Sequence, residues 1–152
     1  MPKALIATDG SDFALNAATR VKQLLSGDLE YTLLTVVPPP VLPVAAPVTG
    51  IEAAPIATPE QTEELTEAYK DEAESSLERT ARAFGGEVAR RIEYGDPAAE
   101  IRRVAEDEGF DVVVVGSHGS GFVKRVLLGS VSQHLLHHAP CPVLVVRTPD
   151  HS

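Results

Sequence analysis

The sequence predicts an α/β protein: a single three-layer domain in which helices cover both faces of a five-stranded parallel sheet of order 3-2-1-4-5. Three observations support this fold class. Short apolar runs alternate with helical patterns along the chain. The apolar run that ends at Val115 suits a strand buried on both faces. A length of 152 residues suits one domain with one core, spanning 1–152.

The first strand and helix are marked by a change from an apolar run to a helical pattern. Lys3–Thr8 is apolar enough for a buried strand. Turn and cap residues follow, and Asp9 is a candidate helix cap. Apolar residues then recur at helical spacing from Phe13 to Leu25, which predicts a helix.

A second strand, a proline-rich loop and a long helix come next. Tyr31–Val37 predicts the strand, and the prolines after it predict an irregular loop over 38–58. Thr58 and Gln61 match a capping box with proline at the first helical position, so a helix begins there. Gly85 ends this helix.

The second half of the chain continues the alternation. Val88–Tyr94 is the third predicted strand, and Asp96 caps a helix that ends at Gly109. Asp111–Val115 is the fourth strand. Pro142–Arg147 is the fifth, after one more helix.

The segment after the fourth strand predicts an anion site. The strand runs into Gly116-Ser117-His118-Gly119, and Gly129-Ser130 follows after nine more residues. Glycines allow positive φ and close approach of a ligand. Ser130 and Gln133 match a second capping box, so a helix that begins at Ser130 would direct its free N–H groups and a partial charge of roughly +0.5 at an anion.

Two common phosphate-binding motifs are excluded. A Walker A loop would need Lys and Ser or Thr where Phe122 and Val123 stand. A dinucleotide GxGxxG motif fails because Lys124 occupies the third glycine position. Lys124 and Arg125 are candidates to neutralise phosphates, or they are simply solvated.

The predicted topology brings the ends of three strands together. Ligands of open parallel sheets bind beyond the carboxyl ends of the strands, where the strand order reverses. The order 3-2-1-4-5 places Asp9, Val37 and Gly116 at one crevice. An apolar wall, a carboxylate and glycines suit the base, ribose and phosphates of a nucleotide.

Residue patterns do not indicate catalysis or metal binding. His134, His137 and His138 have helical spacing, but no cysteine or carboxylate joins them, so a surface or packing role is predicted. Cys141 lies between two prolines at the start of an apolar strand and is predicted to be a passive thiol. No Ser-His-Asp or Cys-His grouping stands out.

Charge and hydropathy exclude two classes of partner. The formal net charge of -9 opposes binding to nucleic acid and to anionic membranes. No stretch approaches the roughly 20 apolar residues of a membrane span. The first residues lack a signal-peptide core, so the expected location is the cytoplasm.

The spacing of three glycines and a serine carries a family resemblance. Gly116, Gly119, Gly129 and Ser130 match the pattern of the ATP-binding branch of the universal stress protein family without a gap. The opening residues 4–11 are similar to that family's first strand and aspartate. The resemblance implies a Rossmann-like, adenine nucleotide alpha-hydrolase-like fold and a stress-response role.

The resemblance assigns an adenine nucleotide to the crevice. It implies that Asp9 and the backbone around Ala7 and Val37 receive adenine and ribose, with Val115 beside them. Ser120 departs from the basic residue common in this branch, so ADP and AMP are open beside ATP, with any Mg²⁺ held mainly by phosphate oxygens. The ribose and phosphates would contact the remaining site residues: Gly116, His118, Gly119, Gly129, Ser130, Val131 and Ser132.

Two main classes of function remain open. One is a nucleotide-responsive stress protein with slow or incidental turnover. The other is an enzyme, a weak ATPase or a phosphoryl or nucleotidyl transferase, with His118 as acid-base group or nucleophile. A purely structural dimer with an empty crevice is a third. The resemblance implies a homodimer whose fifth strands, Val143–Val146, pair antiparallel across a two-fold axis.

Overall fold

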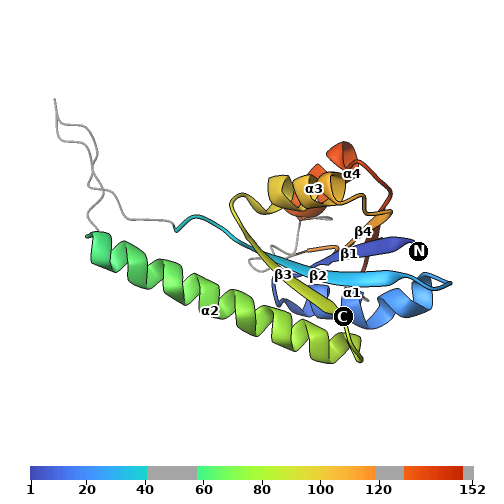
Figure 1. The fold of residues 1–152 in the computed structure, drawn as a ribbon, viewed down its shortest axis with the longest axis horizontal. Coiled ribbons are helices and arrows are strands. Elements are labelled where there is room, and N and C mark those ends of the chain that lie inside the picture. The colour runs from blue at the N-terminus through green and yellow to red at the C-terminus, as the bar shows by residue number, and fades with distance from the viewer. Residues whose placement is uncertain (41–57, 119–128, 149–152) are drawn as a thin grey trace.

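A computed structural model describes residues 1–40, 58–118 and 129–148. The sheet is parallel with strand order β3-β2-β1-β4-β5, which confirms the predicted topology. Helices α1 and α2 cover one face and α3 and α4 the other (Figure 1). The elements in chain order are β1 (Lys3–Ala7), α1 (Asp12–Leu24), β2 (Glu30–Val37), α2 (Pro59–Phe84), β3 (Ala89–Tyr94), α3 (Pro97–Asp107), β4 (Val112–Gly116), α4 (Ser130–His138) and β5 (Val143–Val146).

Each face of the sheet has its own apolar core. Successive side chains of a strand point to opposite faces. Leu5 and Leu34 therefore pack with α3 and α4, whereas Ile6 and Leu33 pack with α1 and α2. All four side chains are fully buried. Burial on both faces explains why the central strands β1 and β4 are nearly unbroken apolar runs rather than alternating patterns.

Helix α2 is long and only partly covered by the sheet. Its 26 residues begin at the predicted capping box, in which Thr58 and Gln61 exchange hydrogen bonds of 2.9 and 3.1 Å. Gly85, with φ of 73°, ends it as predicted. Its amino-terminal end projects beyond the sheet (Figure 1). No helix in the described part of the chain has both the length and the apolar composition that crossing a bilayer requires.

Helix α1 begins among the predicted turn and cap residues, but the candidate Asp9 is not its N-cap. The N-cap is Ser11, whose Oγ accepts the Ala14 N–H at 3.3 Å. Asp9 instead accepts the Ser11 N–H through Oδ1 at 2.9 Å, which makes a local turn. The Asp9 carboxylate therefore shapes the loop between β1 and α1 and does not cap the helix.

The predicted capping box of α4 is also wrong. Gly129 is the N-cap and Ser130 is the first helical residue, with no side-chain cap bond. The Gly129 N–H donates to the carbonyl of Ser117 at 2.8 Å, and its own carbonyl accepts the Gln133 N–H at 3.0 Å. The backbone of the glycine thus anchors the helix start to the residue that follows β4.

The two edges of the sheet differ in chemistry. On the β3 side, Arg91 forms ion pairs with Glu93 at 2.6 Å and with Glu108. Arg103 of α3 reaches Glu93 at 3.1 Å and Glu100 at 2.7 Å. On the other side, the four residues of β5 are all apolar and three of them are only half-buried. Charged side chains protect the first edge from pairing with another chain, whereas no strand among the described residues pairs with the outer side of β5.

Cys141, just before β5, is expected to react slowly with thiol reagents. It is half-buried against the core beneath α3 and α4. Burial raises its pKa, the negative charge of Asp111 raises the pKa further, and a hydrogen bond with the Val113 backbone opposes them. Since the thiolate is the nucleophile, a raised pKa reduces the reactive fraction at neutral pH. The single cysteine should react with a disulfide reagent faster in urea than in buffer, and equal rates would contradict this assignment.

Candidate functional site

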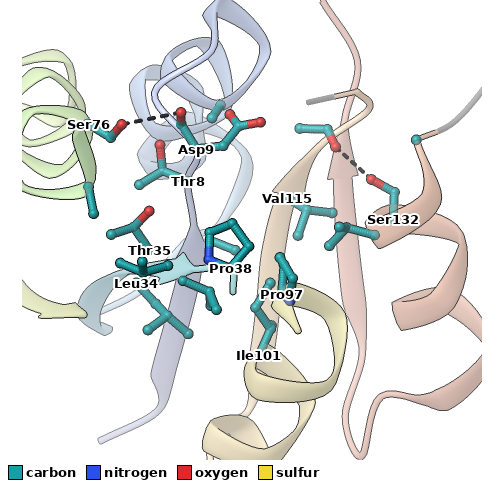
Figure 2. A pocket seen from close by; sticks show the side chains of 18 of the residues that line it. Thr8, Asp9, Leu34, Thr35, Pro38, Ser76, Pro97, Ile101, Val115 and Ser132 are labelled. Carbon is teal, nitrogen blue, oxygen red and sulfur yellow. Dashed lines mark hydrogen bonds between the residues drawn. The ribbon is translucent and has the colours of Figure 1, made fainter. Parts of the chain in front are cut away.

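A cavity of about 720 Å³ lies at the carboxyl ends of β1, β2 and β4. Its volume falls within the range of roughly 300–1,000 Å³ that small-molecule sites occupy. Figure 2 shows α2 on one side of it, β4 and α4 on the other, and α3 below. The strand order reverses between β1 and β4, so the cavity lies where open α/β sheets bind their ligands.

The cavity brings together all the predicted site residues that the structure describes. They come from positions far apart in the chain, at the ends of three strands and the start of α4. Gly119, Lys124 and Arg125 lie outside the described residues. The predicted residues that line the cavity are Ala7, Asp9, Val37, Val115, Gly116, His118, Gly129, Ser130, Val131 and Ser132.

Gly116 is required for space rather than for backbone conformation. Its φ is not positive, unlike that of Gly10, so the expected use of positive φ at this position is wrong. A Cβ on Gly116 would lie 2.8 Å from both the carbonyl carbon and the oxygen of Phe13, and 3.1 Å from the Ala14 nitrogen. All three are backbone atoms at the start of α1, which cannot rotate away. Only glycine lets β4 end this close to α1.

The start of α4 is held over the end of β4. Ser132 is buried and donates through Oγ to the Gly116 carbonyl at 2.8 Å (Figure 2). The first N–H groups of a helix have no partners within the helix. Since the first turn, Ser130 to Ser132, lines the cavity, these groups and the positive end of the helix dipole are available to an anion there.

Asp9 lies in a turn that α2 supports. Its carboxylate is exposed and holds the Ser11 N–H, while its carbonyl accepts a hydrogen bond from Ser76 Oγ at 3.3 Å. Figure 2 shows Ser76 reaching from α2 to this carbonyl at the rim of the cavity. The turn therefore presents a carboxylate to the cavity from a fixed backbone.

His118 lines the cavity from the segment that follows β4. Its ring is half-buried, with Nδ1 3.2 Å from Ser117 Oγ. The ring centroid lies 5.1 Å from that of Phe13, at an interplanar angle of 59°. These contacts place the imidazole between the end of β4 and the start of α1.

The backbone around Val37, which was predicted to receive adenine and ribose, presents the peptide group of Val36 to the cavity. The register between β1 and β2 ends at Ala7 and Leu34, while β2 continues to Val37. The carbonyl of Leu34 accepts a bond from the β1 side, and that of Val37 accepts one from the β3 side. Peptide groups alternate in direction along a strand, so the N–H and carbonyl of Val36 point to the β1 side of β2, beyond the point where β1 ends. The cavity lies on this side.

Side chains from α2 and α3 also line the cavity without having been predicted. A single sequence carries no signal for them, because α2 follows a long proline-rich stretch of sequence and its docking position cannot be derived from spacing. They add an apolar floor and a polar rim. The α2 and α3 residues are Tyr69, Glu72, Ala73, Ser76, Pro97 and Ile101.

The carboxylates of the described cavity lining have no lysine or arginine beside them in that lining. Among the lining residues that the structure describes, Asp9 and Glu72 supply the carboxylates, and there is no lysine or arginine. Within the described ranges no group of three or more His, Cys, Asp or Glu side chains is placed to hold a metal ion. The rings of His134 and His138 lie 4.6 Å apart on α4, outside the cavity lining.

The model of the universal stress protein family matches residues 1–147. The chain belongs to the universal stress protein family. Universal stress protein MJ0531 of Methanocaldococcus jannaschii is 33% identical over 148 residues, which are 97% of this chain and 82% of that protein.

Solved structures of the family share the fold. MJ0577 of the same archaeon superimposes with a TM-score of 0.74 at 30% identity, covering 97% of this chain and 96% of that one. A universal stress protein of Arabidopsis thaliana, solved with AMP bound, gives a TM-score of 0.63 at 22% identity, covering 98% of this chain and 93% of that one. The likeness to the plant protein is one of fold.

Proposed function

We propose that this universal stress protein binds an adenine nucleotide in the cavity and responds to it as a stress-response factor. The observation that carries the proposal is the cavity itself, which joins Asp9, Gly116 and the first turn of α4 at the switch point of the sheet. The AMP bound to the Arabidopsis relative supports the class of ligand.

Different parts of the cavity lining suit the base, the ribose and the phosphates of a nucleotide. The Val36 peptide supplies one donor and one acceptor, which match the acceptor N1 and the donor amine of adenine. Pro97 and Ile101 cover an apolar base face. The Asp9 carboxylate suits ribose hydroxyls, because it only accepts hydrogen bonds. The start of α4 suits the phosphates.

The charges of the lining residues bear on how many phosphates the ligand carries. The Asp9 carboxylate repels a polyphosphate, whereas the Glu72 carboxylate is paired with Arg79 at 3.1 Å, and Ser120 replaces the basic residue common in the ATP-binding branch. We therefore propose AMP and ADP as ligands beside ATP. Magnesium ions that accompany ATP or ADP would be held mainly by the phosphate oxygens, since Mg²⁺ keeps much of its water shell.

The variant Asp9→Asn tests the proposal without disturbing the turn. Asparagine keeps the Oδ1 acceptor for the Ser11 N–H and removes only the charge. Hydrogen bonds to charged groups are worth about 1.5–3 kcal/mol, so calorimetric titration with ATP, ADP and AMP should show affinity lowered about tenfold or more. Asp12→Asn is the matched control, because Asp12 is an exposed residue outside the cavity lining.

Unchanged affinity in Asp9→Asn would remove Asp9 from the site. Wild-type protein that binds none of the three nucleotides would overturn the proposed function and favour the structural dimer with an empty crevice. Mass spectrometry of the small molecule released on denaturation would identify a ligand that is retained through purification.

An enzymatic role is the second candidate, and the position of His118 favours it. A half-buried imidazole that faces a nucleotide cavity is placed for acid-base work. An enzyme should release phosphate from ATP, and His118→Ala should abolish the release while nucleotide binding persists. Release no higher than the uncatalysed background would remove this candidate.

We also propose that the protein forms a homodimer through β5. The carbonyls of Pro142 and Val146 accept hydrogen bonds from the β4 side. Because peptide groups alternate in direction along a strand, those of Val143 and Val145 point away from β4, to the outer edge of the sheet. An apolar edge strand with outward donors and acceptors suits pairing with a second copy across a two-fold axis.

A further inference from the structure

A chain of buried hydroxyl groups connects the Asp9 turn to α2. The Gly10 N–H donates to Thr8 Oγ1 at 3.1 Å, and Thr8 Oγ1 lies 2.7 Å from Thr80 Oγ1. Thr80 Oγ1 in turn donates to the Ser76 carbonyl at 2.7 Å. Ser76 connects α2 back to the turn, because its Oγ donates to the Asp9 carbonyl at 3.3 Å.

The direction of this chain follows from counting hydrogens. A threonine hydroxyl has one hydrogen, and that of Thr80 is used on a carbonyl, which can only accept. Thr8 must therefore donate to Thr80, and its own oxygen accepts from Gly10. The hydroxyl hydrogens of Thr8 and Thr80 each have one destination, whereas Ser76 Oγ has both the Asp9 carbonyl at 3.3 Å and Glu72 Oε1 at 3.5 Å within reach. Loss of the Thr80 hydroxyl therefore leaves that of Thr8 without its acceptor.

The groups in this chain are buried, which makes an unpaired member costly. Thr80 is fully buried, and Thr8 and Ser76 are 6% and 2% exposed. A buried donor or acceptor without a partner costs about 1–3 kcal/mol. Moving the Asp9 turn away from α2 would break two of these hydrogen bonds together.

Close packing holds the same turn from α2. Gly10 has φ of 78°, and a Cβ there would lie 2.5 Å from Ser76 Oγ and 2.3 Å from Arg79 Nη2. Side chains of α2 therefore pack directly against the backbone of Gly10, next to Asp9. Figure 2 shows Thr8 between Ser76 and the cavity.

We propose that Thr80 is a positioning residue for ligand binding: through Thr8 it holds the Asp9–Gly10 turn, and so the Asp9 carboxylate, in the geometry that meets the nucleotide. Thr80 is absent from the cavity lining, so it acts only through the turn. The inference rests on the proposed nucleotide site.

Thr80→Val tests the inference, because valine keeps the shape and removes the hydroxyl. The dissociation constant for AMP should rise about tenfold, as expected for one buried hydrogen bond. Thr80→Ser restores the hydroxyl and should remain within about twofold of wild type. Thr66→Val is the matched control, since Thr66 makes the same bond to the preceding turn of α2, to the Thr62 carbonyl at 2.9 Å, but lies outside the cavity lining.

A second readout separates positioning from general destabilisation. Hydrogen exchange at the Gly10 amide should be faster in Thr80→Val than in Thr66→Val, and slow again in Thr80→Ser. If Thr80→Val does not fold, Thr80→Ala removes the same hydroxyl and should give the same two results. A double variant of Thr8→Val and Thr80→Val should lose no more affinity than Thr8→Val alone, because Thr8→Val already removes the hydrogen bond to Thr80 together with the one from Gly10.

The outcomes are distinguishable from those of the proposed function. Wild-type affinity in Thr80→Val, with Asp9→Asn weakened, would overturn the positioning role and leave the nucleotide site standing. Equal losses in Thr80→Val and Thr80→Ser would also overturn it, because the hydroxyl that serine restores would then fail to restore binding. Absence of nucleotide binding in wild type would overturn both proposals.

Discussion

Replacing Gly116 with valine is expected to lower the stability of the protein and to abolish nucleotide binding. The first added carbon would lie 2.8 Å from the Phe13 backbone, and valine adds two further methyl groups. Overpacking a core costs typically 1–3 kcal/mol and more where backbone must move. We expect a loss of roughly 3 kcal/mol, which lowers the melting temperature of a domain of this size by about 6–12 °C.

The steric cause can be checked with a graded series and without ligand. Gly116→Ala should lie between wild type and Gly116→Val in melting temperature, because alanine adds only the first carbon. The shifts must be present in nucleotide-free protein, since the contact is between β4 and α1 rather than with a ligand. Wild-type melting curves for both variants would show that α1 yields and that the space at Gly116 is not needed.

Replacing Val145 with proline is expected to convert the proposed dimer to a monomer. The Val145 peptide points outward from β5, so proline removes a donor to the second copy and leaves the hydrogen bonds to β4 in place. Light scattering coupled to gel filtration should show the mass halved to that of one chain, 16.1 kDa.

Proline at the other edge is the matched control. Arg90 lies on β3, and by the same alternation its peptide group points outward. Arg90→Pro should leave the mass of the wild-type particle unchanged, because the charged network on that side already prevents pairing. Dissociation by Arg90→Pro, or a dimer that survives Val145→Pro, would place the interface elsewhere.

Most of the fold could be predicted because every strand except the charged edge strand β3 contains a short apolar run between turn residues. The strand order follows from the resemblance and from right-handed crossovers, and the structure confirms it. The two errors, at Asp9 and at Ser130, concern helix starts. In both, the sequence held several residues able to cap, and the choice among them depended on tertiary contacts such as that of Gly129 with Ser117.

The part of the candidate site at the strand ends could be predicted from the topology. Asp9, Val37 and Gly116 were expected at one crevice because the strand order brings strand ends together, whereas Val131 and Ser132 were expected only from the family resemblance. The backbone around Val37 was expected too, but the Val36 peptide could not be singled out, because the direction in which one peptide faces requires the register with both neighbours. Residues of α2 were missed because nothing in a single sequence indicates where a helix docks after a long proline-rich stretch.

The cavity takes its walls from residues between Ala7 and Ser132, on both faces of the sheet. It therefore exists only when nearly the whole chain is folded, and a ligand bound there stabilises the entire molecule rather than one part. At a free concentration one hundred times its dissociation constant, such a ligand adds about 2.7 kcal/mol to the free energy of unfolding. If nucleotide occupies the cavity, the lifetime of the folded protein becomes a measure of nucleotide supply, and depletion of the nucleotide pool would shorten it.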